Sequence, residues 1–193
     1  MDIVTIYFAV LTIVSCFVYW LLSYKYRVIF LIGLSCVFIG SLSINLLCYV
    51  IIFALFNYSV ALHLPDSKIK KSLFNIGIII NILQIVLLKY YDFTIGPLFD
   101  LFEIDSGLSR ISQIIVPIGV SYFTLQGIGY LINVNMGWEK PERRVLNFIL
   151  YIIFFPKFLS GPIERSNHFL PQLNTRQSFN LENASTGLRI ALG

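Results

Sequence analysis

The sequence predicts an all-α membrane protein, a polytopic transmembrane helix bundle with about five spans and a re-entrant or tilted sixth segment. Three observations predict this class. Hydrophobic residues make up 57% of the 193 residues and charged residues only 12%, too little charge to cover a soluble domain of this length. Apolar runs of about 20 residues recur, which is the length of helix that crosses a hydrocarbon core. The charges lie mainly between these runs.

The first apolar run predicts a retained spanning helix over Ile3–Leu22. No basic segment precedes it and no small-residue cleavage site follows, as a secretory signal would require. Instead it is followed by aromatic residues and by Lys25 and Arg27, an arrangement typical of anchoring at a membrane interface.

The second apolar run, Val28–Leu62, is too long for one span. The polar stretch Gly40-Ser-Leu-Ser-Ile-Asn45 interrupts it, which predicts two short or tilted helices joined by a tight turn. Ser72–Tyr91 is the fourth predicted span. Polar residues follow over Asp92–Ser112.

A fifth helix is predicted to open at Pro117 and to run to about Val134. The sixth apolar segment, Val145–Leu159, is short for a full crossing, and prolines and a glycine break its end. Irregular backbone at membrane depth survives only where protein or a water-filled cavity satisfies it. We therefore expect a site near residues 154–165.

The loop charges predict the orientation. Basic residues follow the first helix, precede the fourth and follow the fifth, whereas the loop between the fourth and fifth is acidic. Since basic loops stay in the cytoplasm, this predicts a multi-pass protein of the plasma (inner) membrane with its N-terminus outside. Arg165, Arg176 and Arg189 follow the sixth segment, so we expect that segment to return to the cytoplasmic side.

The whole chain, 1–193, is predicted to be a single transmembrane domain. Residues 166–193 are expected to form a polar cytoplasmic segment that leads into a missing helix, which would leave the domain incomplete at its C-terminus. The net charge of +4 is dispersed, so no nucleic-acid partner is expected.

Polar residues recur at helical spacing inside two predicted spans. The fifth helix has Gly119, Tyr122, Gln126, Tyr130 and Asn133 on one face, and the fourth has Gly77, Asn81 and Gln84. They could hydrogen-bond neighbouring helices or line a polar channel. The spacing alone favours hydrogen bonding between helices.

Three further side chains are candidates for chemistry. Lys157, inside the sixth segment, could bind an anionic substrate group or snorkel to the headgroups on its long stem. His63 is predicted to lie in a loop and His168 in a polar stretch, and neither has a nucleophile and an orienting carboxylate nearby. No cofactor motif or metal cluster is found in the sequence.

A series of motifs runs in order through residues 117–173: Pro117-Ile-Gly-Val-Ser-Tyr-Phe-Thr-Leu-Gln126, Tyr130-Leu-Ile-Asn-Val134, Lys140-Pro-Glu-Arg143, Phe154-Phe-Pro-Lys-Phe-Leu-Ser-Gly-Pro-Ile-Glu-Arg165 and Phe169-Leu-Pro-Gln-Leu173. This series closely resembles the membrane-bound O-acyltransferase family. It is most similar to the bacterial branch that holds alginate O-acetyltransferase and the D-alanyl transferase of teichoic acids. Leu88-Lys-Tyr-Tyr91 and Asn57-Tyr58 resemble weaker family landmarks, so the resemblance covers nearly the whole chain.

The resemblance implies a bundle with a thin centre, where a tunnel admits an acyl donor and an acceptor hydroxyl from opposite sides. The family's catalytic histidine lies in the second half, which is absent here, so no residue of this chain is assigned as catalytic. The expected tunnel or motif positions are Pro156, Lys157, Gly161, Pro162, Arg165, Gln126 and Asn133. Asn133 stands where relatives often have aspartate, and Lys157 where an uncharged polar residue is common.

We therefore expect the N-terminal part of a membrane-bound O-acyltransferase that O-acetylates an exported polysaccharide or cell-wall polymer, inactive on its own. The expected donor is acetyl-CoA or an acyl carrier thioester, and no bound cofactor is expected. The expected partners are membrane lipid, the polymer acceptor, and acyl-carrier or envelope acetylation proteins. The alternative is a non-catalytic membrane component, such as a transporter half or an assembly subunit.

Overall fold

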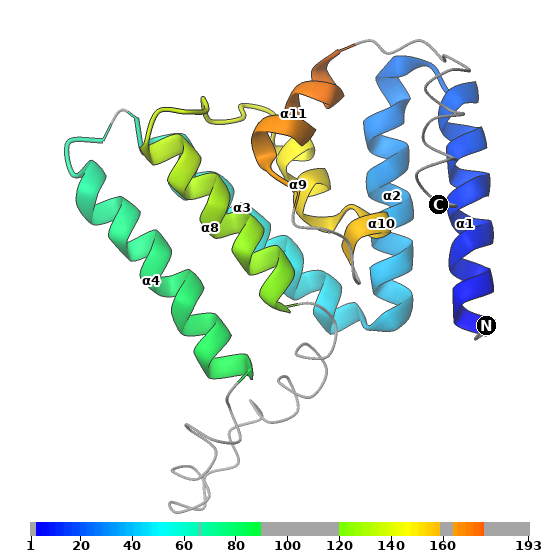
Figure 1. Cartoon of the computed structure of the whole chain (residues 1–193), viewed down its shortest axis with the longest axis horizontal. Helices are drawn as coiled ribbons and strands as arrows, with labels where there is room; N and C mark the ends of the chain where they lie inside the picture. Colours follow the sequence, from blue (N-terminus) through cyan, green and yellow to red (C-terminus); the bar gives the residue numbers. More distant parts are fainter. Residues whose placement is uncertain (1–2, 66, 90–119, 159–163, 176–193) are drawn as a thin grey trace, which may run out of the picture.

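The computed structural model describes residues 3–65, 67–89, 120–158 and 164–175. Within these ranges the chain forms helices and loops and no strand (Figure 1). The helices are α1 (Ile3–Leu21), α2 (Tyr24–Leu42), α3 (Ile44–His63), α4 (Lys70–Lys89), α8 (Val120–Asn135), α9 (Val145–Ile153), α10 (Phe155–Phe158) and α11 (Ser166–Asn174).

Three of the described helices are long and apolar enough to cross a membrane, namely α2, α3 and the Lys70–Leu88 part of α4. Leu11–Leu21 of α1 adds a shorter apolar helix. The protein is therefore a helical membrane protein, as its composition predicts. The start expected for the fifth helix, Pro117, lies outside the described residues.

The division of the long apolar run into two helices is confirmed. α2 ends at Leu42, and Ser43 then adopts an extended conformation with φ −166° and ψ 128°. Its Oγ accepts a hydrogen bond from the backbone N–H of Leu46 at 3.4 Å, which caps α3. Two predictions of detail were wrong. α2 begins at Tyr24 rather than Val28, because the interfacial residues 24–27 join its first turn, and His63 is the last residue of α3 rather than a loop residue.

α3 lies at the centre of the bundle and packs against α2, α4, α8 and α9. Its buried side chains meet an aromatic cluster, in which Phe123 of α8 packs edge-on against Phe53 at 5.1 Å and parallel to Phe158 at 6.1 Å between ring centroids. α1 and α4 lie at opposite sides of the bundle (Figure 1). Many of their large apolar side chains are exposed, as is expected of surfaces that face lipid.

The polar residues of α4 bind neighbouring helices, as their spacing predicts. Asn81 exchanges two side-chain hydrogen bonds with Asn57 of α3, at 2.9 and 3.3 Å. Gln84 accepts a hydrogen bond from the Tyr49 hydroxyl at 2.6 Å and donates one to Thr124 of α8 at 2.7 Å. These bonds hold α3, α4 and α8 together. They matter in a membrane because lipid tails are as apolar as the side chains, so the hydrophobic effect does not drive helices together there.

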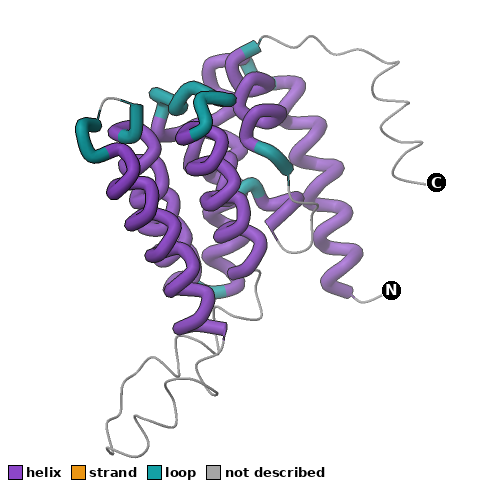
Figure 2. Tube along the Cα trace, turned by 60° about the vertical axis from the view of Figure 1, so that its left-hand side comes forward, coloured by secondary structure: helices purple, strands orange, loops and turns teal. Residues whose placement is uncertain are grey.

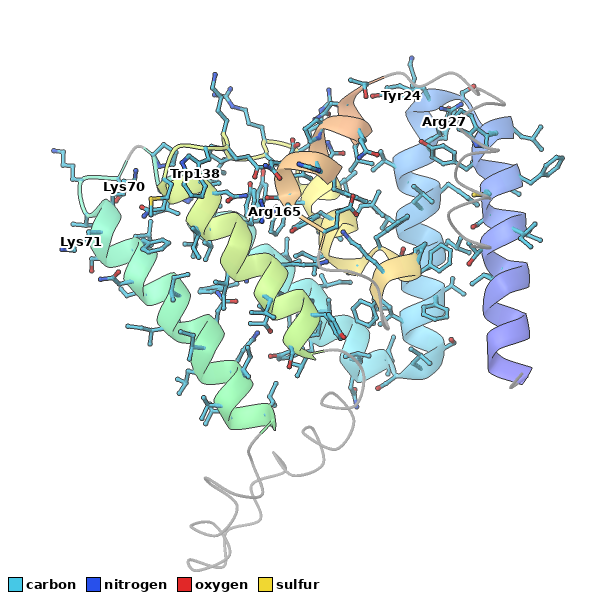
Figure 3. The ribbon with its side chains drawn as sticks, in the orientation of Figure 1. Tyr24, Arg27, Lys70, Lys71, Trp138 and Arg165 are labelled. Carbon is cyan, nitrogen blue, oxygen red and sulfur yellow. The ribbon has the colours of Figure 1, made fainter. Side chains whose placement is uncertain are left out.

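The connecting loops gather mainly at one end of the bundle (Figure 2). Figure 3 shows Tyr24 and Arg27 at this end, together with Lys70, Lys71 and Trp138. The basic residues at the start of α2, at the start of α4 and in the loop after α8 therefore share one end, called here the basic end. The sequence expectation that these segments lie on one side of a membrane requires this arrangement.

Gly127 of α8 supplies a test of this packing. A Cβ atom at Gly127 would lie 2.8 Å from Phe53 Cζ and 3.2 Å from two atoms of the Asn57 amide, whereas one at Gly129 would meet nothing within 4 Å. We expect Gly127→Ala to lower the free energy of unfolding by about 1–3 kcal/mol. Gly129→Ala, the matched control, is expected to leave it unchanged or higher. Thermal unfolding in detergent measures both, and equal effects would contradict the close contact between α3 and α8.

Candidate functional site: two cavities around a broken helix

The sixth apolar segment breaks at Phe154. Residues 145–153 form α9, which is about 14 Å long, about half the thickness of a hydrocarbon core. A continuous helix would need an N–H at Pro156, and proline has none. Phe154 therefore turns to φ −52° and ψ 109°, and α10 restarts with the Phe155 N–H bonded to Ser35 Oγ at 3.2 Å.

The chain then returns to the basic end. Ser166, which opens α11, donates a hydrogen bond to Glu139 in the loop after α8, and the Tyr24 hydroxyl at the start of α2 donates one to the carbonyl of Leu173. Residues 166–174 of the segment expected to be polar form α11, whose apolar residues Phe169 and Leu170 are buried. The sequence did not predict this helix, because a few apolar residues on one face of a short, otherwise polar helix give only a weak pattern.

Lys157 of α10 is buried, with 7% of its surface exposed. Its Nζ lies 3.7 Å from Glu164 Oε2 and makes no hydrogen bond within the described part of the protein. The ammonium also lies 4.0 Å from the ring centroid of Phe169 and 4.4 Å from that of Tyr151, distances at which cation–π attraction is effective. The snorkelling alternative is therefore wrong, because the ammonium is enclosed by protein.

A cavity of about 340 Å³ lies between α8 and the chain that returns from α10. We call it the polar cavity. Its lining contains Gln126, which is buried, Asn133, which is half-buried, and Arg165, which is exposed. The remaining lining residues are Leu125, Gly129, Ile132, Trp138, Tyr151, Glu164, Ser166 and Asn167. Amides, a guanidinium and a carboxylate thus meet in one cavity that is open to the surface, which is typical of ligand sites.

Glu139 fixes one edge of the polar cavity. Its Oε2 accepts hydrogen bonds from Ser166 Oγ at 2.6 Å and from Asn133 Nδ2 at 3.4 Å, and Asn133 Nδ2 also donates to Ser166 Oγ at 3.3 Å. Burial raises the pKa of Glu139 above its ordinary value of 4.5, while the bonds from Ser166 and Asn133 oppose that rise. The cluster holds α11 to the end of α8.

The raised pKa gives a pH dependence. A carboxyl with a raised folded-state pKa favours the folded state while it is protonated, and this contribution is lost as pH rises from about 4.5 through the folded-state value. Glu139→Gln keeps the acceptor but cannot ionise. We expect the stability of the wild type relative to Glu139→Gln, measured by thermal unfolding, to fall over this pH range. A difference that does not change with pH would contradict the burial of Glu139.

A second cavity, of about 370 Å³, lies among α1, α2, α10 and α11. We call it the apolar cavity. Pro156 lines it, together with Phe154, Phe155 and Phe169, and residues from Thr12 to Trp20 of α1 form the far wall. Glu164 lines both cavities. Lys157 therefore lies between them, since Tyr151 lines the polar cavity and Phe169 the apolar one.

The sequence is similar to those of several curated acyltransferases. The chain is 24% identical over 165 residues to a protein of Azotobacter vinelandii named "Probable alginate O-acetylase AlgI", covering 82% of this chain and 33% of the relative. It is 28% identical to the peptidoglycan O-acetyltransferase of Helicobacter pylori, covering 70% and 31%. It is 26% identical to the teichoic acid D-alanyltransferase of Lacticaseibacillus rhamnosus, covering 68% and 27%.

The chain is similar, over most of its length and at low identity, to curated members of the membrane-bound O-acyltransferase family. This confirms the resemblance read from the motifs of residues 117–173. The chain spans about a third of the length of these curated relatives. No protein-family model matches it, and no solved structure matches it.

The family resemblance singled out seven positions, and the structure brings several of them together. Gln126, Asn133 and Arg165 line the polar cavity. Pro156 lines the apolar cavity and Lys157 lies between the two. The remaining two positions, Gly161 and Pro162, lie outside the described residues.

Three residues at this site were not expected. Glu164 belongs to the Gly161–Arg165 motif but carried no signal of its own, because its pairing with Lys157 depends on the break at Phe154. Glu139 and Ser166 meet across 27 residues of sequence, and no local pattern predicts such a contact. The one available hint was position, since Glu164 lies inside one quoted motif and Glu139 directly precedes another.

Neither histidine takes part. His63 and His168 are exposed and neither lines a described cavity. His63 Nδ1 lies 2.8 Å from the carbonyl of Ser59 in its own helix. Among the described residues, no group of three or more histidine, cysteine, aspartate or glutamate side chains could hold a metal ion.

Proposed function

We propose that this chain forms part of a membrane-bound O-acyltransferase that esterifies hydroxyl groups of an exported polysaccharide or cell-wall polymer. The carrying observation is the polar cavity, which brings Gln126, Asn133 and Arg165 together beside the broken helix. The relatives' names, alginate O-acetylase, peptidoglycan O-acetyltransferase and teichoic acid D-alanyltransferase, support the class of acceptor.

The polar cavity is proposed to receive the acyl donor, acetyl-CoA or the thioester of an acyl carrier protein. It lies near the basic end, which we take as cytoplasmic because basic loops stay on that side. Its amides can exchange hydrogen bonds with an amide-containing thioester arm. Arg165 can pair with a phosphate or carboxylate of the donor.

The same argument gives the proposed topology. α9, α10 and α11 form a re-entrant segment of a multi-pass plasma-membrane protein, because the chain goes half-way in and returns to the end from which it started. The acceptor polymer would then arrive from the opposite side. A thin centre lets the two substrates meet without either crossing the membrane.

In acyl transfer to a hydroxyl, a base takes the hydroxyl proton, the oxygen attacks the thioester carbon, and a thiol leaves as the ester forms. The described histidines lie outside the cavities, and no residue here matches the family's catalytic histidine. We therefore propose that the base comes from sequence outside these 193 residues, and that this chain alone does not transfer acyl groups.

Deleting the gene and restoring it in the source cell tests the proposed function. Surface polysaccharide and cell-wall polymer are isolated, and their O-acyl esters are measured by mass spectrometry before and after mild alkaline hydrolysis. We expect the esters to be lost on deletion and regained on restoration. Unchanged ester content would favour the alternative, a non-catalytic membrane component such as a transporter half or an assembly subunit.

A further inference from the structure

A third cavity, separate from the proposed donor site, lies at the basic end between the first turns of α2 and α9. It has a volume of about 730 Å³ and is closed on one side by Leu173 of α11. We call it the basic groove. The Tyr24 hydroxyl lines this groove and fixes its wall by donating a hydrogen bond to the carbonyl of Leu173 at 2.8 Å.

Among the described residues that line the basic groove, three are cations and none is a carboxylate. Lys25, Arg143 and Arg144 are all exposed, and the ion pair found within the described residues is elsewhere, between Lys157 and Glu164. The neighbouring Glu142 is engaged through both of its oxygens, one by the backbone N–H of Arg144 and the other by the Asn174 amide. Within the described residues none of the three cations forms an ion pair, so the groove keeps a net positive charge that an anionic ligand can neutralise.

The helix ends add to this charge. Both α2 and α9 begin at the groove, and neither Ser23 nor Arg144, their N-cap residues, makes a side-chain capping bond. The amide N–H groups of a first helical turn and the positive end of the helix dipole favour phosphate and other anions. Two helix starts and three cations thus lie at one open groove.

The groove continues into apolar surface on the same two helices. Val28 and Ile29 of α2 and Val145 and Leu146 of α9 line it, and Ile29 and Leu146 are 57% and 46% exposed. These residues lie one turn or less from the cations, on the side that enters the membrane. A soluble phosphorylated compound would leave this apolar surface uncovered, whereas a lipid would cover it with its chains.

We propose that the basic groove binds one anionic phospholipid of the cytoplasmic leaflet. The phosphate lies among Lys25, Arg143 and Arg144, and the acyl chains lie along Ile29 and Leu146. This inference rests on the cytoplasmic orientation of the basic end and not on acyl transfer. A failure of the proposed enzyme function would leave it standing.

The test measures lipid binding to the purified full chain in detergent by native mass spectrometry and by thermal unfolding. Phosphatidylglycerol is compared with phosphatidylcholine, which has no net charge. The groove variant Lys25→Gln/Arg143→Gln/Arg144→Gln is compared with Lys68→Gln/Lys70→Gln/Lys71→Gln. The control removes the same charge from a separate basic depression at the same end of the bundle.

We expect phosphatidylglycerol to bind and to raise the unfolding temperature more than phosphatidylcholine does. Since each cation near a membrane surface contributes about a fivefold gain in affinity for anionic lipid, the groove variant should bind about a hundredfold more weakly. The control should keep wild-type binding. Circular dichroism and size exclusion show whether each variant is folded.

Three results would overturn the proposal. Equal loss of binding in the two variants would mean that the lipid responds to the overall positive charge of this end and not to a specific site. Equal binding of phosphatidylglycerol and phosphatidylcholine would mean that the cations are not used. Displacement of phosphatidylglycerol by millimolar inorganic phosphate or acetyl-coenzyme A would identify the occupant as a soluble anion.

Discussion

Replacing Glu164 with glutamine is expected to lower the free energy of unfolding by about 3 kcal/mol, which is more than replacing Lys157 with methionine costs. The first change leaves the buried Lys157 ammonium without its counter-charge, with the rings of Tyr151 and Phe169 as its remaining attractive neighbours. Glu164 itself is 35% exposed, so solvent screens part of the loss. We therefore expect the lower end of the range for broken buried pairs.

Lys157→Met removes charge and burial cost together. Methionine fills the volume of the lysine stem, and its sulfur makes favourable contacts with aromatic rings. We expect a change within about 1 kcal/mol, and we expect Lys157→Met/Glu164→Gln to be more stable than Glu164→Gln alone. Lys140→Met, at an exposed lysine of the same end, is the control for loss of a surface charge.

Thermal and denaturant unfolding in one detergent measure all four variants. If Lys157→Met were the most damaging of them, the ammonium would contribute more than its ion pair, and the account of Lys157 would be wrong. If source cells carrying Lys157→Met kept the protein at its wild-type level but lost O-acyl esters, that result would instead favour the alternative that Lys157 binds an anionic group of the substrate.

The second large effect is expected at the amide pair between α3 and α4. Asn57 and Asn81 are 0% and 1% exposed, and each also donates a hydrogen bond to a carbonyl of its own helix, Phe53 and Gly77 respectively. Replacing either asparagine with leucine leaves the partner's carbonyl oxygen without its donor. Such an orphaned buried group costs about 1–3 kcal/mol, and we expect about 2 kcal/mol for each single variant.

The double variant Asn57→Leu/Asn81→Leu is expected to cost less than the sum of the two single variants, because no amide is then left unpaired. Asn75→Leu, on an exposed face of α4, is the control and should change stability by less than about 0.5 kcal/mol. Strictly additive effects in a double-mutant cycle would show that the two amides do not bond one another.

The parts of the fold that sequence predicted are those governed by local chemistry. Helix length follows from runs of apolar residues, and the turn at Ser43 follows from polar residues that can cap a helix. The interhelical role of Asn81 and Gln84 follows from their spacing on one helical face. Each of these inferences needs only residues within a few turns of one another.

The candidate site was predicted as a set of residues but not as a geometry. Family motifs gave Gln126, Asn133 and Arg165, and the structure brings them to one cavity. The Glu139–Ser166 bond and the packing of α11 depend on the chain folding back at Phe154. The proline at position 156 shows that the helix must break nearby, but the direction that the chain then takes depends on tertiary contacts.

The central claim is that the polar cavity serves acyl transfer. It is tested most directly by the O-acyl ester content of the surface polymer in cells that carry Arg165→Ala or Gln126→Leu, at equal protein levels in the membrane. Lys140→Ala, an exposed lysine that does not line the cavity, is the control. If the polar cavity serves acyl transfer, we expect at least a tenfold loss of esters in the cavity variants and wild-type ester content in the control. Wild-type ester content in both cavity variants would contradict this claim.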